Sequence, residues 1–387
     1  DCLATLNIFK MLGVKIEKID KNSYSITGKG LYGLKKTEKN LDCGNSGTSM
    51  RLLAGLLSAQ KFSSILVGDR SLNKRPMERI SIPLTMMGAN INLSDNKTAP
   101  IRINSSKKIL PIEYKMPIDS AQIKSSIILA SLYADSETKI LENTPTRDHT
   151  ENMVNFLNGN IIKVNNKIII DPKTKLISRD INIPGDISSA MFLIVACLIS
   201  KNSEILIQNV GLNNLRTGCL DILRLMGAQI NISNIRKFGS EKFGDIKVIS
   251  SKLRGIEIPK KYVASSIDEF PILFIAAANA SGKTVLKNAE ELRYKESDRL
   301  NAMSQGLSSC NIAHKLFYDG IEIEGGEMCG ATVNSFDDHR VAMSFLIAGI
   351  SAKEPITVLN TKNILTSFPD FYSLIKDAGV NIIRENN

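Results

Sequence analysis

The chain has 387 residues, of which 43% are hydrophobic and 23% are charged, and its formal net charge is +10. This length predicts two or three domains, and the composition is that of an ordinary globular protein. No apolar run approaches the ~20 residues of a membrane-spanning helix, so we expect no membrane partner.

The cysteine, histidine and aromatic content argues against several further classes of protein. Six cysteines without CxxC spacing predict reduced thiols in a cytoplasmic protein. Three histidines far apart in the sequence argue against a histidine-based metal site. With no tryptophan, 5% aromatic residues and no nucleic-acid-binding motif, we expect no nucleic acid partner. We interpret the positive charge as a lysine-rich surface together with a basic site that attracts small polyanions.

One pattern recurs along the whole chain: a helical run, a small residue and a short strand of alternating polarity. Its copies are FKMLGVKIEKI at Gly13, LTMMGANINL at Gly88, FLNGNIIKV at Gly159, LRLMGAQINI at Gly227, GLSSCNIAHKL at Ser309 and IKDAGVNII at Gly379. In the four clear copies the glycine predicts the C-terminal cap of a helix, whereas the copies at Gly159 and Ser309 are degenerate. The spacing of about 70 to 80 residues predicts six compact α/β units.

A second pattern lies between these copies: a cluster of small or polar residues followed by an almost wholly apolar helix. Its copies lie at 44–59, 119–134, 185–200, 265–280 and 336–350. Helices that are apolar on nearly all sides are buried, so well-capped core helices would explain the pattern by themselves. The charges at these caps are unusual and point to a ligand: Arg51, Asp268, Glu269, Asp337, Asp338 and Arg340.

The two patterns also predict the organisation of the chain. Six copies of the first and five of the second imply a missing capped helix before Leu6. Because the chain starts at Asp1 rather than Met, we expect that the given sequence lacks an N-terminal segment. A break near Ile177 to Gly185 leaves three copies of the first pattern on each side. We therefore predict two lobes, 1–180 and 181–387.

Two turns in the first lobe could bind an anion. The segment GNSGTSMR opens a helix, and Gly47 would let backbone N–H groups approach a ligand closely. It is neither a Walker A loop nor a dinucleotide fingerprint. The segment NKRPM places Lys74 and Arg75 in a basic turn, which could equally be solvated.

Two further segments of this lobe carry hydrogen-bonding or charged side chains at helix starts. The segment DSAQ offers Ser120 and Gln122 as donors, although ordinary N-capping explains it as well. In TRDHTE, Arg147 either reaches a ligand or lies in solvent, and His149 is a capping or surface histidine rather than a general base.

The second lobe combines cations with carboxylates. Asp268 and Glu269 precede a very apolar helix, where capping is the simple interpretation but partial burial could make one of them a base. RYKESDR and FDDHR each lead into an apolar helical run. Arginines grip carboxylate and phosphate, while carboxylates can move protons. If RYKESDR is helical, Lys295 and Arg299 share one face and Glu296 points about 100° away, which a surface ion-pair network would also satisfy.

Taken together, these motifs resemble the 5-enolpyruvylshikimate-3-phosphate synthase family. GNSGTSMR, KRPM, SAQ, IDEFP, LRYKESDR, DDHRVAMSF and TSFPDF stand in the family's order along essentially the whole chain. SAQ and TRDHTE resemble the glyphosate-tolerant class II branch. The resemblance implies an α/β fold of two lobes, each built from three βαβαββ units with buried helices, in an inside-out α/β barrel.

The resemblance also implies an activity: transfer of the enolpyruvyl group of phosphoenolpyruvate to the 5-hydroxyl of shikimate 3-phosphate, with release of phosphate. It implies a cytoplasmic monomer that uses no metal and no cofactor. The catalytic residues would be Asp268 as base, Lys295 beside it, and Glu296 as the acid that protonates the methylene carbon of phosphoenolpyruvate. The substrate-binding residues would be Gly47, Arg75, Ser120, Ala121, Gln122, Arg147, Asp268, Lys295, Arg299 and Arg340. Among these, Arg299 and Arg340 would hold the carboxylate of phosphoenolpyruvate, and Arg75, Gln122 and Gly47 its phosphate.

The sequence departs from the family pattern at three places. The PGDKSxxxR segment, which supplies a Lys, a Ser and an Arg to the substrates, is absent. Ala121 replaces the second serine of the SSQ version, as in class II, and Thr366 replaces a lysine found before TFPD in the other branch.

Two other functions remain open from the sequence. The sister enzyme that transfers enolpyruvate to UDP-N-acetylglucosamine usually carries a reactive cysteine on a loop, and no cysteine lies near Lys74 to Met77. A non-catalytic anion-binding protein would do better without the carboxylates of Asp268 and Glu296.

Overall fold

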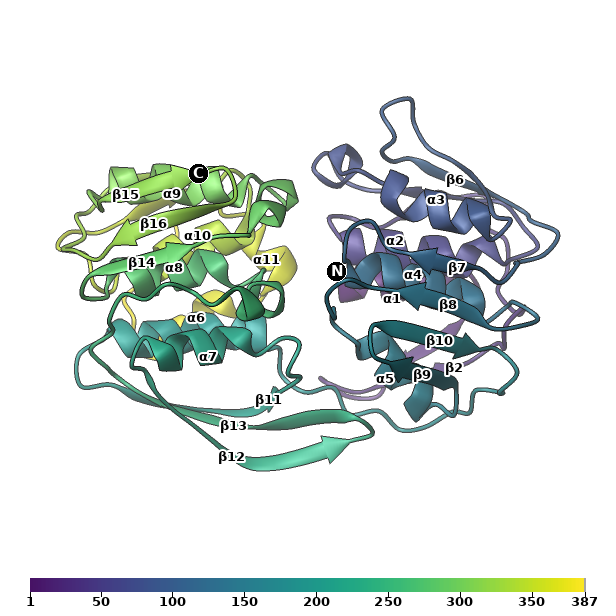
Figure 1. The fold of residues 1–387 in the computed structure, drawn as a ribbon, viewed down its shortest axis with the longest axis horizontal. Helices are drawn as coiled ribbons and strands as arrows, with labels where there is room; N and C mark the ends of the chain where they lie inside the picture. The colour runs from purple at the N-terminus through teal and green to yellow at the C-terminus, as the bar shows by residue number, and fades with distance from the viewer. Residues whose placement is uncertain (386–387) are drawn as a thin grey trace. The chain divides into compact units, whose positions relative to one another are not determined.

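The protein divides into two compact units, Asp1–Asp180 (unit 1) and Ile181–Asn387 (unit 2). Their structure comes from a computed structural model that describes residues 1–385 (Figure 1). Each unit alternates helices and strands and has a hydrophobic core of its own, so each is an α/β body.

Unit 1 contains two four-stranded sheets and a two-stranded ribbon. The sheets have the strand orders β3-β4-β6-β5 and β7-β8-β10-β9, and the ribbon pairs β1 with β2. The strands are β1 (Lys15–Lys18), β2 (Tyr24–Thr27), β3 (Leu41–Asp42), β4 (Ser64–Val67), β5 (Asn90–Asn92), β6 (Ile101–Asn104), β7 (Glu113–Lys115), β8 (Thr138–Leu141), β9 (Asn160–Val164) and β10 (Lys167–Asp171). The helices are α1 (Cys2–Met11), α2 (Gly47–Ser58), η1 (Leu72–Lys74), α3 (Glu78–Met86), α4 (Ala121–Ser131) and α5 (His149–Phe156). In both large sheets the first pair of strands is parallel and the other pairs are antiparallel.

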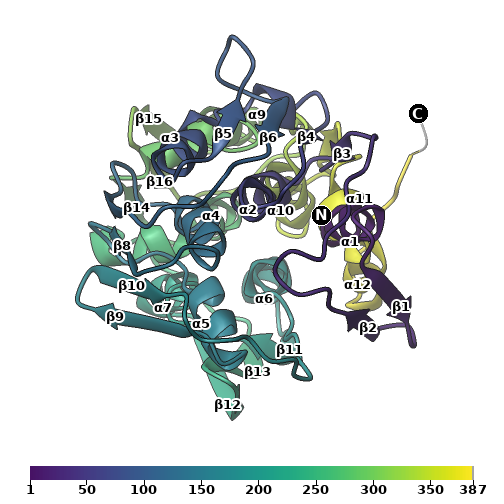
Figure 2. The same cartoon turned by 90° about the vertical axis from the view of Figure 1, so that its right-hand side faces the viewer.

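Helices α2 and α4 lie side by side in the core of unit 1, where they pack against the large sheets (Figure 2). Their backbones approach closely at Gly55, where an added Cβ atom would lie only 2.1 Å from the carbonyl oxygen of Ser126. This approach sets α2 and α4 in register, so that their N-terminal turns lie close together.

Unit 2 contains two three-stranded sheets and one parallel pair. The sheets have the orders β11-β13-β12 and β14-β16-β15, and β17 pairs with β18. The strands are β11 (Glu204–Gly211), β12 (Gln229–Phe238), β13 (Glu241–Ile249), β14 (Lys283–Leu286), β15 (His314–Phe317), β16 (Gly320–Glu324), β17 (Thr332–Asn334) and β18 (Thr357–Leu359). The helices are α6 (Ile187–Ile199), α7 (Gly218–Leu225), η2 (Lys260–Tyr262), η3 (Ala264–Ser266), α8 (Phe270–Ala278), η4 (Glu290–Tyr294), α9 (Arg299–Ser309), α10 (His339–Ala348), α11 (Ile364–Ser367) and α12 (Phe371–Asp377). Helices α6, α8 and α10 pack on one another in its core.

The five predicted apolar helices are α2, α4, α6, α8 and α10. All nine residues of α8 are buried, as its composition predicts. Three of the five have a side-chain cap, from Ser46 on α2, Asp186 on α6 and Asp338 on α10. Ser120 stands at the N-cap position of α4, but its side chain makes no capping hydrogen bond, so ordinary capping does not account for this serine.

In all six copies of the first pattern, the chain leaves the helix through a residue with a left-handed backbone conformation (positive φ). The clear copies use Gly13, Gly88, Gly227 and Gly379, with φ between +85° and +98°. In the degenerate copies the left-handed residues are Asn158 (φ +72°) and Asn311 (φ +59°) rather than Gly159 and Ser309. Asparagine tolerates this region better than other residues with a Cβ atom. The predicted strand after Gly379 is wrong, because residues 380–385 form no strand.

Candidate functional site

Unit 1 gathers two guanidinium groups over the N-terminus of α2. A Cβ atom added at Gly47 would lie 3.1 Å from Nη1 of Arg75 and 3.4 Å from Nη1 of Arg51. The free N–H groups of the helix start and two arginines therefore converge on one small volume. Such an arrangement attracts a phosphate or a carboxylate.

Hydrogen bonds tie this volume to α4. The guanidinium of Arg51 donates to Oε1 of Gln122, and Nε2 of Gln122 donates to Oγ1 of Thr48 at 2.8 Å. On the other side, Nη2 of Arg75 donates to Oδ1 of Asn45 at 3.1 Å. The predicted residues Gly47, Arg75 and Gln122 thus belong to one cluster.

The observed cluster differs from the predicted one at three residues. Arg51, predicted only as a charged helix cap, and Asn45, which was not predicted, both belong to the cluster, and both stand inside GNSGTSMR. Lys74 is exposed, so of the two basic residues in this turn only Arg75 joins the cluster.

The second group of predicted residues in unit 1 surrounds the start of α4. Ser120 and Ala121 open the helix, and Arg147 lies in the segment between β8 and α5. Asp119 ties this segment to the helix start, because its carboxylate accepts from the backbone N–H groups of Asn143 at 2.7 Å and Thr144 at 2.8 Å. Arg147 is therefore carried by a segment attached to α4, whereas His149 is exposed.

Unit 2 surrounds one arginine with three carboxylates. Arg299 is 1% exposed, with Nε 2.9 Å from Oδ2 of Asp338, Nη2 2.5 Å from Oε2 of Glu296 and Nη1 3.5 Å from Oδ1 of Asp268. Lys295 lies 3.3 Å from the same Oδ1 of Asp268. Burial lowers the pKa of Arg299, but the three carboxylates outweigh it and raise that pKa overall.

Arg340 joins this cluster through the start of α8. Its Nη1 donates to the backbone oxygen of Asp268 at 2.9 Å and lies 3.4 Å from Oε1 of Glu269. Burial raises the pKa of Glu269, against the attraction of Arg340. One connected set of contacts therefore joins all five residues predicted in this unit: Asp268, Lys295, Glu296, Arg299 and Arg340.

The predicted helical geometry of RYKESDR is wrong. Helix α9 begins at Arg299, because the carboxylate of Asp298 accepts from the N–H of Asn301 at 3.0 Å and caps the helix there. Lys295 has an extended backbone, and Glu296 lies in the same loop. The three charged side chains meet through the loop rather than along one helix face.

A further layer of charge in unit 2 was not predicted. Ser188 donates to Oε1 of Glu269, and Nη2 of Arg216 donates to Oγ of Ser188 at 2.5 Å. Nη2 of Arg216 also lies 3.0 Å from Oδ1 of Asp186. Asp186 could have been predicted, because it stands in GDISSA at the start of an apolar helix. Nothing in the sequence around Arg216 indicates that Arg216 contacts these residues.

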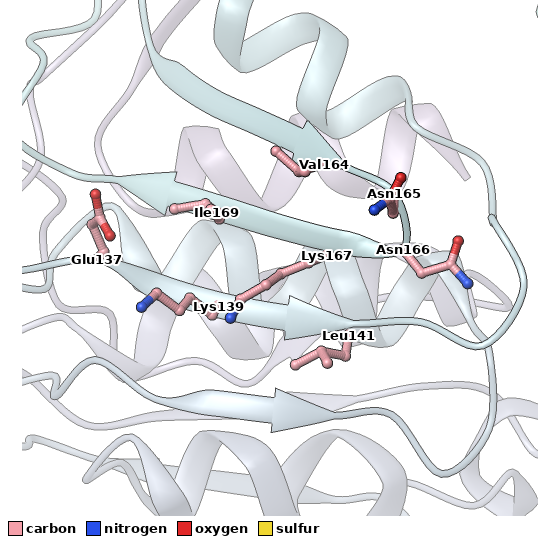
Figure 3. A pocket seen from close by; sticks show the side chains of 8 residues that line it. All are labelled: Glu137, Lys139, Leu141, Val164, Asn165, Asn166, Lys167 and Ile169. Atoms are coloured by element: carbon pink, nitrogen blue, oxygen red, sulfur yellow. The ribbon is translucent and has the colours of Figure 1, made fainter.

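A separate groove lies over strands β8, β10 and the end of β9, on the face of this sheet that carries Lys139, Leu141, Lys167 and Ile169 (Figure 3). None of its lining residues belongs to the clusters described above, so we do not assign it to the site. Among residues 1–385, no group of three or more His, Cys, Asp and Glu side chains could hold a metal ion. No helix within the described chain is long and apolar enough to cross a membrane.

Comparison with known proteins identifies the family. The family model described as EPSP synthase (3-phosphoshikimate 1-carboxyvinyltransferase) matches residues 1–375. A 3-phosphoshikimate 1-carboxyvinyltransferase of Legionella pneumophila (strain Corby) is 52% identical over 371 residues, covering 96% of this chain and 86% of the relative. The enzyme of the same name from Methylococcus capsulatus is 47% identical over 382 residues, covering 99% and 87%.

Solved structures agree with this relationship. An EPSP synthase from Acinetobacter baumannii matches with a TM-score of 0.87 and 45% identity, covering 97% of this chain and 87% of that one. The enolpyruvyl transferase NikO from Streptomyces tendae matches with a TM-score of 0.77 at 14% identity, covering 98% and 86%, which shows the shared fold alone. The chain therefore has the α/β enolpyruvyl transferase fold and belongs to the EPSP synthase (3-phosphoshikimate 1-carboxyvinyltransferase) family.

Proposed function

We propose that the protein transfers the enolpyruvyl group of phosphoenolpyruvate to the 5-hydroxyl of shikimate 3-phosphate and releases phosphate. The observation that carries this proposal is the cluster in unit 2, where Asp268 and Glu296 contact Lys295 and Arg299. Pure anion binding would be weakened by carboxylates at this place, whereas addition followed by elimination needs groups that accept and donate protons.

The proposed roles in unit 2 follow the order of the reaction. Asp268 takes the proton of the 5-hydroxyl as that oxygen attacks C2 of phosphoenolpyruvate, and Glu296 gives a proton to the methylene carbon. Glu296, now a carboxylate, then takes a proton from the resulting methyl group as the C2–O bond to phosphate breaks, which restores the double bond and releases phosphate. Lys295 stabilises the charge on Asp268, and Arg340 binds the carboxylate of phosphoenolpyruvate.

Arg299 is proposed to bind that carboxylate as well, and its surroundings set a condition on this role. Its side chain is 1% exposed and already contacts three carboxylates. A substrate carboxylate must therefore displace one of them, and Glu296, which is half-buried in a loop, can move more easily than Asp338 at a helix cap.

The proposed roles in unit 1 concern binding. Arg75, Gln122 and the backbone at Gly47 hold the phosphate of phosphoenolpyruvate, since two arginines and a helix N-terminus converge there. Ser120, Ala121, Gln122 and Arg147 bind shikimate 3-phosphate at the start of α4. We also propose that the protein acts as a cytoplasmic monomer without cofactor or metal.

The proposal extends to the finer architecture. We infer two lobes, 1–180 and 181–387, each built from three βαβαββ units with their helices buried as in an inside-out barrel. The element order β-α-β-α-β-β in residues 41–104 and 113–171 supports this inference.

The test of the proposed function is a turnover assay on the purified enzyme. We expect phosphate release only when phosphoenolpyruvate and shikimate 3-phosphate are both present, and mass spectrometry should detect the enolpyruvyl product. Turnover with UDP-N-acetylglucosamine in place of shikimate 3-phosphate would assign the enzyme to the sister reaction. Tight binding of both substrates without turnover would indicate a non-catalytic protein.

A substitution at Gly47 tests the phosphate-binding turn. Glyphosate resembles phosphoenolpyruvate in charge but is longer, and class II enzymes often carry alanine where this chain has Gly47. We expect Gly47→Ala to weaken inhibition by glyphosate more than it raises KM for phosphoenolpyruvate, because the new methyl group would stand 3.1 Å from Nη1 of Arg75 and narrow the site. The measurement is a pair of inhibition curves in competition with phosphoenolpyruvate, and equal inhibition constants in the two proteins would remove Gly47 from the site.

A further inference from the structure

A lysine is buried beneath the start of α4. Lys124 is 0% exposed, and its Nζ lies 3.2 Å from Oε2 of Glu142 and 2.7 Å from Oε1 of Glu151. Glu142 is also buried, and its Oε1 accepts from Nζ of Lys163 at 2.9 Å. The ions come from four places in the fold: α4, the end of β8, the first turn of α5, and β9.

This ion cluster holds every polar group of Thr146. The N–H and the hydroxyl of Thr146 donate to Oε2 of Glu142 at 3.1 Å and 2.9 Å. Its carbonyl oxygen accepts from Nζ of Lys124 at 3.1 Å. Because Thr146 directly precedes Arg147, the Lys124–Glu142 pair fixes the point from which the Arg147 side chain extends.

The ions are poorly explained by stability alone. Removing two charges from water costs several kcal/mol per ion, and well-packed apolar residues at such places are often as stable or more stable. Burial raises the pKa of Glu151 even against the attraction of Lys124, so this carboxylate is held there at a cost. What the pair supplies that apolar packing could not is directional bonding to a backbone N–H and a carbonyl.

We propose that Lys124 and Glu142 are positioning residues for the shikimate 3-phosphate subsite. They would act through Thr146 to place Arg147 relative to Ser120 and Gln122, which stand on the same helix as Lys124. This inference rests on the proposed function, because it assumes that these three residues bind shikimate 3-phosphate. The hydrogen bonds that join the turn at Gly47 to Arg51, Arg75 and Gln122 involve none of the residues of the ion cluster.

Two variants test the inference on the purified enzyme. Thr146→Val keeps the shape and leaves all ions paired but removes one hydrogen bond to Glu142, and we expect about threefold weaker binding of shikimate 3-phosphate. The double variant Lys124→Met with Glu151→Gln removes one cation and one anion together and frees the Thr146 carbonyl, and we expect a loss of about tenfold or more. In both variants KM for phosphoenolpyruvate should stay within about twofold, a split that general destabilisation would not produce.

Lys163→Met is the matched control, since it removes a partner of Glu142 and leaves all three bonds to Thr146 in place. Its affinity for shikimate 3-phosphate, measured by calorimetry, should equal that of the unsubstituted enzyme. Unchanged affinity in both Thr146→Val and the folded double variant would overturn the inference. If the double variant does not fold, Thr146→Val decides alone, with unchanged affinity again overturning it.

Hydrogen exchange separates this inference from the proposed function. In the absence of any substrate, the backbone amides of residues 143, 144 and 146–148 should exchange faster in the double variant than in Lys163→Met. If the unsubstituted enzyme binds no shikimate 3-phosphate, the proposed function fails, yet equal exchange in the two variants would still overturn the positioning role by itself.

Discussion

Glu296→Gln should lower kcat by about 10² to 10⁴-fold while shikimate 3-phosphate still binds with nearly the same affinity. The amide has the shape of the carboxylic acid and can still accept from Arg299, but it cannot give a proton to the methylene carbon. Asp268→Asn should cause a loss of similar size, because the amide cannot take the proton of the attacking hydroxyl. Steady-state kinetics gives kcat, and calorimetry gives the affinity independently of turnover.

Glu290→Gln is the control for these two amide variants. Glu290 lies six positions before Glu296 on η4, and its carboxylate accepts from the hydroxyls of Tyr294 and Tyr318, outside the cluster. Its kcat should match that of the unsubstituted enzyme. Near-normal kcat in both Glu296→Gln and Asp268→Asn would refute the assignment of acid and base.

Asp338→Asn should lower the free energy of unfolding by about 1.5 to 3 kcal/mol, because Arg299 loses its most deeply buried carboxylate partner and keeps only Asp268 and Glu296. Asp338 is 0% exposed, and its carboxylate accepts from Nε of Arg299, Oγ of Ser297 and the N–H of Arg340. The amide can replace part of the cap but not the charge that compensates Arg299. Urea unfolding at neutral pH measures the difference.

The effect of Asp338→Asn should depend on pH with a definite sign. Burial raises the pKa of Asp338, but the guanidinium of Arg299 outweighs it and holds this pKa below the ordinary 3.8. The stability that the carboxylate contributes is therefore fully present above about pH 4 and disappears as the pH falls through the pKa in the folded state. We expect a constant difference in stability between the two proteins down to about pH 4, and a shrinking difference in more acidic buffer.

Asp337→Asn provides the matched control for stability. Asp337 is the exposed neighbour of Asp338, and its left-handed backbone (φ +59°) suits asparagine. Its free energy of unfolding should change by less than about 0.5 kcal/mol. A loss in Asp338→Asn no larger than that of Asp337→Asn would show that the buried pair with Arg299 contributes little.

The sequence predicted those parts of the fold that local chemistry determines. The apolar runs behind small or charged caps became the buried helices α2, α4, α6, α8 and α10, and the glycine joints adopted the left-handed backbone that only glycine and asparagine reach easily. In the two degenerate copies, the predicted left-handed residue is one or two positions away from the observed Asn158 and Asn311. The prediction relied on glycine or another small residue, whereas asparagine also adopts this conformation.

The two clusters could be predicted where their residues stand in short charged motifs, but not where residues distant in the sequence meet. Lys295 and Glu296 lie in a loop because Asp298 caps α9 and the helix begins at Arg299. The sequence would also allow this helix to begin earlier. Lys124 was overlooked because a single lysine inside an apolar helix looks like a surface residue until Glu142, 18 positions later, is seen to lie against it. Such pairings depend on tertiary packing, which no local pattern encodes.

If unit 2 binds an anionic substrate as proposed, the surroundings of Arg299 make that binding an exchange of ion-pair partners rather than the filling of a bare positive site. The three carboxylates of Asp268, Glu296 and Asp338 already outnumber the two cations, Lys295 and Arg299, that they contact. An incoming anion therefore displaces carboxylates of the protein more than dissolved chloride or phosphate. The affinity of unit 2 for an anionic ligand should therefore depend less on ionic strength than its number of cations suggests. Foreign anions should compete only weakly, because they too must break ion pairs within the protein.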